Sequence, residues 1–121
     1  MIEQIKSSEI KKFIEKNPKT VLLDVRTEDE WNSVGKPISD SLGIKTFFIT
    51  ISQDPGFIEN VKKEINKENK VLVMCAAGGR SIIAASLLQS EGYTVHNISD
   101  GFSGNGQDPG WKNSGLPSDK T

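Results

Sequence analysis

The one cysteine of the chain, Cys75, stands where a thiol could be activated as a nucleophile. It directly follows the apolar run 71–74, and a helical pattern begins a few residues later. The loop in between is formed by Ala76, Ala77, Gly78, Gly79, Arg80 and Ser81. A glycine-containing turn from a strand into a helix gathers unpaired backbone N–H groups and the positive end of the helix dipole. Such a turn favours an anion, so it predicts a thiolate at Cys75.

Arg80 adds a positive charge to this loop, and a guanidinium does not deprotonate in proteins. Because a nearby cation lowers the pKa of a thiol, we expect Arg80 to support the thiolate of Cys75. Gly78 and Gly79 are expected to make the turn possible, since glycine tolerates positive φ and close backbone approach. Ser81 provides a polar start to the helix.

The composition excludes several other classes of function. The chain has 121 residues, 15 basic and 16 acidic side chains, and a formal net charge of −1. It has neither a run of like charges nor a basic stripe interleaved with aromatic residues, so we expect no nucleic-acid partner. One cysteine and one histidine, His96, form no recognisable metal-binding cluster and no internal disulfide. We therefore predict neither a metal nor another cofactor.

The length of the chain and its first residues indicate how many domains it has and where it is located. Its size and its hydrophobic content of 35% fit one domain, residues 1–121, with a loop-rich and partly packed C-terminal segment over 101–121. The first residues lack the apolar core of a secretory signal, and no stretch reaches membrane-spanning length. We expect no membrane partner and a cytoplasmic location.

Hydrophobic patterns predict the strands that must position the cysteine. Continuous apolar runs at 21–23 and 71–74 indicate buried strands, and β-branched residues indicate two more at 46–51 and 94–98. Helical patterns alternate with them. The sequence therefore predicts an α/β fold, a small three-layer sandwich with a largely parallel central sheet of about five strands.

Capping signals predict where the helices begin. Ser7 or Ser8 caps the first helix, and Thr27 with Glu30 three residues later forms a capping box for a second. Asp54 before a proline is a strong start signal for a third.

The fourth helix follows the cysteine loop over residues 81–90. Its spacing predicts an inner face formed by Ile83, Ala84, Leu87 and Leu88. Gly92 is expected to stop it.

Three loops are expected to meet at the site, because ligands of such sheets bind beyond the carboxyl ends of the strands. These loops are Cys75 with its turn, residues 24–26, and the segment after Ile98. Asp24 and Arg26 are interpreted as braces between loops and are left out of the catalytic set.

The remaining conspicuous side chains have structural interpretations. Trp31 and Trp111 are expected to be packing anchors, since large aromatic residues chiefly fill cores. His96 lies within a predicted strand and is interpreted as structural.

Four motifs in this order resemble the single-domain rhodaneses. Residues 22–31 read LLDVRTxxEW, and residues 75–81 read CxxGxRS. Asn97 and Ile98 with Gly101 form the third motif, and 111–117 reads WxxSGLP. The resemblance covers most of the chain.

The resemblance implies the fold described above and a sulfurtransferase reaction. Cys75 would take a sulfane sulfur from thiosulfate or a similar anion, hold it as a persulfide and pass it to cyanide or another thiophilic acceptor, which could be a protein. The loop from Ala76 to Ser81 would bind the persulfide, and Arg80 would be the electrostatic partner of the incoming oxyanion.

Two alternatives remain beside this reaction. Phosphatases and arsenate reductases of the same fold have one more residue between cysteine and arginine, whereas four intervene here, which favours sulfur over phosphate. A persulfide carrier or protein-binding module without efficient turnover needs the same cysteine and is not separated by the sequence.

Two loops depart from the common family pattern. Residues 35–40 read GKPISD where many members read GHIPGA, and the segment 102–110 is longer than in the shortest rhodaneses. Either loop could contact substrate, and the longer one could form a rim over Cys75 or remain a surface loop.

Overall fold

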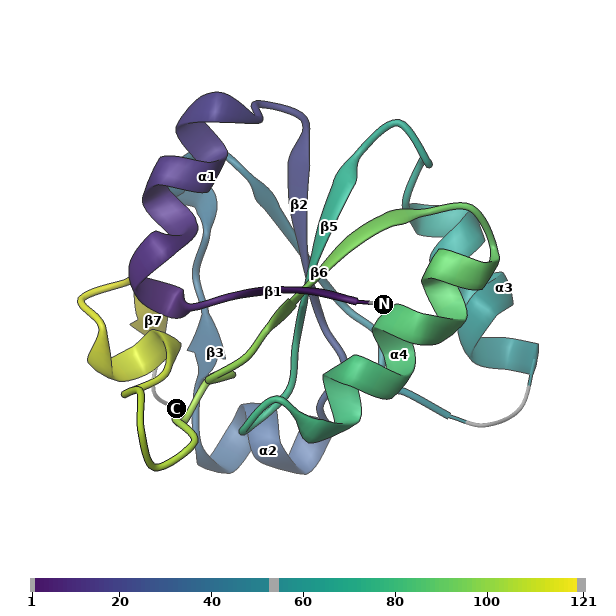
Figure 1. Ribbon diagram of the computed structural model, residues 1–121. Helices are drawn as coiled ribbons and strands as arrows, with labels where there is room; N and C mark the ends of the chain where they lie inside the picture. The colour runs from purple at the N-terminus through teal and green to yellow at the C-terminus, as the bar shows by residue number, and fades with distance from the viewer. Residues whose placement is uncertain (1, 53–54, 120–121) are drawn as a thin grey trace.

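A five-stranded parallel sheet forms the centre of the protein (Figure 1). The computed structural model describes residues 2–52 and 55–119. The strands, in the order β1-β6-β5-β2-β4 across the sheet, are β1 (Glu3–Ile5), β6 (Thr94–Ile98), β5 (Lys70–Met74), β2 (Thr20–Asp24) and β4 (Lys45–Phe48). A separate antiparallel pair joins β3 (Lys36–Pro37) to β7 (Ser118–Asp119). The predicted α/β class and the parallel central sheet are confirmed.

Helices cover both faces of the sheet, which gives the three layers (Figure 1). The helices are α1 (Ile10–Lys16), α2 (Glu28–Ser33), α3 (Pro55–Glu64) and α4 (Gly79–Ser90), and the short 3-10 turns are η1 (Ser7–Glu9), η2 (Asp40–Leu42) and η3 (Trp111–Asn113). Helices α3 and α4 pack on one face, and α1 packs on the other face with the C-terminal segment.

The central strands are apolar on both sides because both sides are covered. Val71 and Val73 of β5 point into the core under α3 and α4, while Leu72 and Met74 point into the core under α1. All four side chains are fully buried. This is the continuous apolar pattern expected of a buried parallel strand.

The capping box predicted for the second helix is present. Thr27 is the N-cap of α2, its hydroxyl accepts from the backbone N–H of Glu30, and the Glu30 carboxylate accepts from the backbone N–H of Thr27. Asp54 lies outside the described residues, and α3 begins at Pro55, the residue after it.

Strand β1 was not predicted from the sequence. Its three residues are too few to show a period of two, and its position is fixed by pairing with β6 at the edge of the sheet. The strand predicted over 46–51 ends earlier than expected. β4 ends at Phe48, which pairs with Asp24 at the end of β2, although the backbone N–H groups of Ile49 and Ile51 still donate to the carbonyls of Asp24 and Val25.

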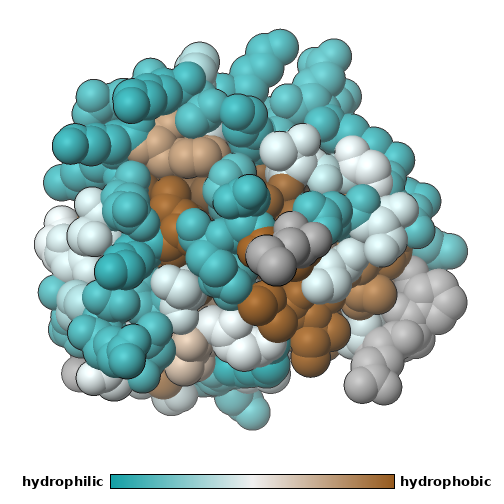
Figure 2. Space-filling model, in the orientation of Figure 1, coloured by the Kyte–Doolittle hydropathy of each residue, from teal (hydrophilic) through white to brown (hydrophobic). Residues whose placement is uncertain are grey.

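The inner face predicted for α4 is half wrong. Ala84 and Leu88 are buried as expected, but Ile83 is 54% exposed and Leu87 is 38% exposed. The buried face is instead formed by Ser81, Ala84, Ala85 and Leu88, at the spacing of one helical stripe. Small residues occupy it because α4 packs closely against β5 and β6. Figure 2 shows the resulting apolar surface in the region of α4. The helix also begins at Gly79, two residues earlier than predicted.

The C-terminal segment completes the core on the α1 side. Phe102, Trp111 and Leu116 are buried there, and the Trp111 Nε1–H donates to the carbonyl of Pro117 at 2.6 Å. Trp111 is thus the packing anchor that its size predicted.

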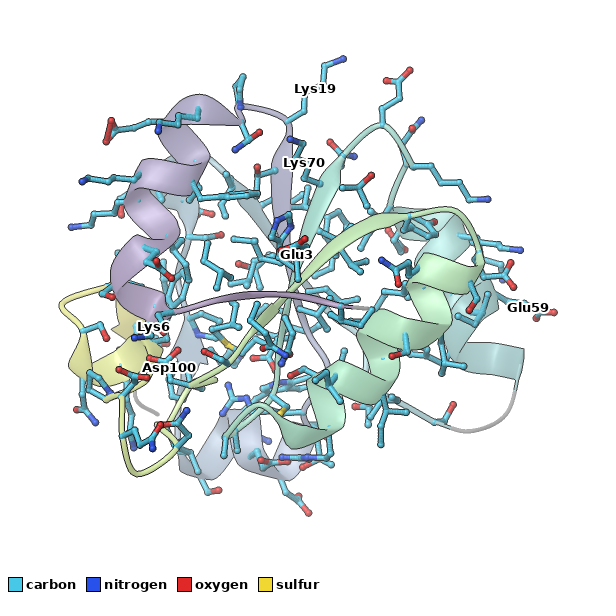
Figure 3. The ribbon with its side chains drawn as sticks, in the orientation of Figure 1. Glu3, Lys6, Lys19, Glu59, Lys70 and Asp100 are labelled. Carbon is cyan, nitrogen blue, oxygen red and sulfur yellow. The ribbon has the colours of Figure 1, made fainter. Side chains whose placement is uncertain are left out.

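Asp100 ties this segment to the start of the chain. Its carboxylate accepts from the backbone N–H and hydroxyl of Ser7, both at 3.0 Å, and from the backbone N–H of Gly110 at 3.0 Å. Figure 3 shows Asp100 beside Lys6, where the loop after β6 meets the end of β1.

No helix in the described parts of the chain is both long enough and apolar enough to span a bilayer.

Candidate active site

Three loops meet at the carboxyl edge of the sheet, as expected. Cys75 follows β5, residues 24–26 end and follow β2, and Ser99 follows β6. The backbone N–H of Val25 donates to the carbonyl of Met74 at 2.9 Å, which joins the first two loops. The parallel register of the strands therefore brings these residues together from distant parts of the sequence.

The sulfur of Cys75 lies inside the turn that leads into α4. Its Sγ accepts a hydrogen bond from the backbone N–H of Gly78 at 3.1 Å, and the residue is only 1% exposed. Ala77 and Gly79 of the same turn are exposed. The sulfur is therefore covered, while parts of the turn around it face solvent.

Hydrogen bonds favour the thiolate against the effect of burial. Burial by itself raises the pKa of Cys75, but hydrogen bonds with Ser81, Gly78 and Ala77 outweigh it and hold the pKa below its usual value. The Ser81 hydroxyl has one proton and donates it to Oδ1 of Asn97. The backbone N–H groups are therefore the donors on which the sulfur mainly depends.

Only one of the two loop glycines is required by the turn. Gly78 has φ +100°, and a Cβ at this position would collide with the carbonyl oxygen of Ser99. Gly79 has open space around the position of a Cβ and no positive φ. The expectation that both glycines make the turn possible is therefore wrong for Gly79.

Arg80, which the sequence predicts as the cation of the cysteine loop, is paired with a carboxylate. Its Nη1 and Nη2 donate to Oε1 and Oε2 of Glu30 at 2.6 and 2.7 Å. Arg80 lowers the pKa of Glu30 to about 2, and Glu30 raises the pKa of Arg80. The hydrogen bonds described above are the main causes that lower the pKa of Cys75, and Arg80 is not among them.

Asp24 and Arg26 form a completely buried ion pair that braces the loops. Nη2 of Arg26 donates to Oδ2 of Asp24 at 2.8 Å and to the carbonyl of Gly35 at 2.9 Å. The guanidinium also stacks on the ring of Phe102, 4.2 Å from its centroid. Nη1 has no hydrogen-bond partner among the described residues. These contacts fit the bracing role and connect the two loops that depart from the family pattern.

The segment after β6 supports the back of the cysteine turn. The backbone N–H groups of Phe102 and Ser103 donate to the carbonyls of Cys75 and Ala76 at 2.8 and 2.9 Å. Gly101 has φ +57°, and a Cβ there would collide with both carbonyl groups. The first residues of the 102–110 segment are thus packed against the site.

His96 lies away from Cys75, beside a surface hollow of about 520 Å³ between β1 and α1. Its ring packs edge-on against Phe13, with 4.7 Å between centroids, and burial lowers its pKa. No residue of the cysteine turn lines this hollow. The structural interpretation of His96 fits this position.

Comparison with known proteins identifies the fold and the family. The family model for the rhodanese-like domain matches residues 7–107. The chain belongs to the rhodanese-like domain family. The crystal structure of Rv0390 from M. tuberculosis superposes on this rhodanese-like domain with a TM-score of 0.85 and 30% identity, covering 98% of both chains. The resemblance seen in the sequence is therefore confirmed.

Two relatives of this rhodanese-like domain carry different kinds of name: one is uncharacterized and the other is named as an enzyme. The uncharacterized protein RP600 of Rickettsia prowazekii is 37% identical over 120 residues, 97% of each chain. Thiosulfate sulfurtransferase 16, chloroplastic, of Arabidopsis thaliana is 35% identical over 68 residues, 55% of this chain and 52% of the relative. The family thus includes sulfurtransferases.

Sequence reasoning missed two contributors to the site. Glu30 was interpreted only as part of a capping box, although its position in the LLDVRTxxEW motif was a signal of a further role. Asn97, which accepts from Ser81 and donates to the carbonyl of Gly78, gave no local signal beyond its place in a motif.

Within residues 2–52 and 55–119, no group of three or more His, Cys, Asp or Glu side chains could hold a metal ion.

Proposed function

We propose that this rhodanese-like domain is a sulfurtransferase that carries a sulfane sulfur as a persulfide on Cys75. The observation that carries the proposal is the position of Sγ, which accepts from the backbone N–H of Gly78 at the start of α4. Donors arranged in this way stabilise a negative charge on sulfur before and after transfer. The loop from Ala76 to Ser81 is the proposed persulfide-binding loop.

The first half-reaction loads the cysteine. The thiolate of Cys75 attacks the outer sulfur of thiosulfate or a similar donor, and a new S–S bond forms as the S–S bond of the donor breaks. With thiosulfate, the electron pair of the broken bond leaves with sulfite. The product is a Cys75 persulfide anion with the same single negative charge as the thiolate it replaces.

The second half-reaction returns the thiolate. Cyanide or another thiophilic acceptor attacks the outer sulfur of the persulfide, and the Cys75–sulfur bond breaks with its electrons left on Sγ. With cyanide the product is thiocyanate. Since Cys75 is the only cysteine of the chain, the sulfur leaves to an external acceptor. The proposal includes a cytoplasmic location, where a reduced thiol persists.

Loop size supports sulfur rather than phosphate chemistry. Four residues separate Cys75 from Arg80, one fewer than in phosphatases and arsenate reductases of this fold. The arginine of the loop is also engaged by a carboxylate, so it is poorly placed to bind a phosphate ester.

A persulfide carrier for a protein acceptor is the second candidate. Ile82 and Ile83 are exposed in the first turns of α4, immediately after the cysteine loop. Exposed apolar residues beside a reactive group are typical of a surface that meets another protein. The carrier and the enzyme share the persulfide and differ in whether a small acceptor turns over.

Steady-state formation of thiocyanate from thiosulfate and cyanide tests the catalytic proposal. Turnover should require Cys75 and should disappear in Cys75→Ser. Loading without turnover to cyanide, together with transfer to a protein thiol, would support the carrier instead. Cys75-dependent hydrolysis of a phosphate ester would contradict both.

A further inference from the structure

The carboxylate of Glu30 is held beside the cysteine loop by more than its ion pair. It occupies the third position of α2, where Oε1 accepts from the backbone N–H of Thr27 at 3.2 Å and from its hydroxyl at 3.1 Å. The same carboxylate receives both Arg80 nitrogens. Because the capping box fixes the carboxylate, Arg80 has a preformed partner before any substrate arrives.

Arg80 is close enough to Cys75 for their charges to interact. The sulfur contributes to the raised pKa of Arg80, although Glu30 is the main cause. Arg80 is the only basic residue in the 75–81 loop. Arg26, on the neighbouring loop, is buried in its own pair with Asp24. Each of these two arginines is therefore neutralised by one carboxylate.

The remaining stabilisation at the cysteine turn comes from backbone dipoles. Those N–H groups suit one negative charge, that of the thiolate or the persulfide. A dianion such as thiosulfate brings two more negative charges to this turn, and no free arginine compensates them. The charge of the donor should therefore affect how well it binds at this turn.

We propose that Glu30 is a specificity-determining residue that keeps Arg80 from the donor, so that the domain prefers monoanionic sulfane-sulfur donors over dianionic thiosulfate. This inference rests on the proposed sulfurtransferase function and names the charge class of its donor. Thiosulfonates meet the description: the thiolate attacks their outer sulfur, the S–S persulfide bond forms, and the S–S bond of the donor breaks to release a sulfinate.

The test compares thiosulfate with benzenethiosulfonate on the wild-type protein, Glu30→Gln and Glu28→Gln. Glutamine keeps the capping box and removes only the charge. Glu28 is an exposed residue on the same helix, so its replacement changes the net charge equally and leaves the Arg80 pair intact.

Coulomb energy scales with the charge of the donor, so the two donors should respond differently. In Glu30→Gln we expect KM to fall about tenfold for thiosulfate and about threefold for benzenethiosulfonate, with kcat changed less than about twofold. Glu28→Gln should match the wild type for both. Equal changes in KM for the two donors, or no change, would overturn the inference.

A binding measurement separates this inference from the proposed function. On a Cys75→Ser background, which transfers no sulfur, titration calorimetry would compare thiosulfate affinity with and without Glu30→Gln. We expect about tenfold tighter binding with the second substitution. Unchanged affinity would contradict the role of Glu30 even if the wild type transfers sulfur. Tighter binding would support it even if the wild type forms no persulfide.

Discussion

The lowered pKa of Cys75 depends mainly on backbone N–H donors, which every residue except proline carries. The backbone N–H groups of Gly78 and its neighbours reach the sulfur because the chain turns tightly from β5 into α4. Apart from Arg80, which pairs with Glu30, the side chains in this loop are small, so the backbone largely defines the environment of the sulfur. The chemistry at the residue scale is therefore a consequence of backbone conformation.

The ionisation of Cys75 should reflect these donors. We expect the midpoint of its titration to lie below about 8.5, the value of an unperturbed thiol. Thiolate absorbance near 240 nm measures this without requiring access to the buried sulfur, and no second cysteine contributes to the signal. The same chain in urea should titrate near the unperturbed value. A native midpoint at or above it would contradict the assignment.

Gly78→Ala and Gly79→Ala form a matched pair for the turn. Alanine at 78 meets a positive φ and the carbonyl of Ser99, so we expect a loss of stability of about 1–3 kcal/mol and a rise of the Cys75 pKa toward its ordinary value. Alanine at 79 should leave both unchanged. Urea unfolding and thiolate titration measure the two effects. Equal responses at both positions would show that the turn does not depend on Gly78.

At the scale of elements, the pair of Glu30 and Arg80 joins the first turn of α2 to the first turn of α4. The capping box and the ion pair share one carboxylate, so the start of α2 and the cysteine loop are positioned together. Helix α2 is only six residues long, and its position depends on such contacts rather than on helix propensity.

This pair should contribute to the pH dependence of stability. The pKa of Glu30 is about 2 in the folded protein against 4.5 for the unperturbed group. A lowered folded pKa stabilises the fold above pH 4.5, and the contribution is lost as the pH falls from 4.5 to 2. Both side chains are partly exposed, so we expect at most about 1 kcal/mol.

The variant Glu30→Gln should lose less free energy of unfolding than the wild type over this pH range. Urea unfolding at several pH values measures the difference. Glu28→Gln should retain the wild-type slope. An identical acid response in Glu30→Gln would show that the ion pair contributes nothing to folding.

Local signals explain which elements the sequence could predict. The apolar runs of β2 and β5 and the capping box at Thr27 depend on neighbouring residues and are present as predicted. Strand β1 and the pairing of Arg80 with Glu30 depend on partners about 50 to 90 residues away, which one sequence does not reveal. The prediction that Ile83 and Leu87 of α4 face the core was wrong for another reason: small residues rather than large ones face the sheet.

At the scale of the whole molecule, the C-terminal segment closes the core on the side of α1. Trp111 is completely buried between the sheet and this segment. Asp100 accepts from Ser7 and Gly110 and so connects the same segment to η1. The parts of the chain that follow β6 are therefore structural supports of the sheet as well as of the cysteine turn.

Trp111→Ala should destabilise the protein by about 3–5 kcal/mol, because it leaves a large cavity and removes the hydrogen bond from the indole to the Pro117 carbonyl, which then keeps only the backbone N–H of Ile38. Trp31 is partly exposed and packs edge-on against Phe48, so Trp31→Ala should cost clearly less. Urea unfolding compares the two variants. Similar losses would contradict the view that residues 111–119 complete the core.

The central claim is that Cys75 carries a sulfane sulfur, and mass spectrometry of the intact protein tests it most directly. After incubation with thiosulfate or benzenethiosulfonate, we expect the wild type to gain the mass of one sulfur atom. Cyanide or a thiol should remove the added sulfur, and Cys75→Ser should not gain it. Absence of the adduct with every sulfane-sulfur donor, or an equal adduct on Cys75→Ser, would contradict the claim.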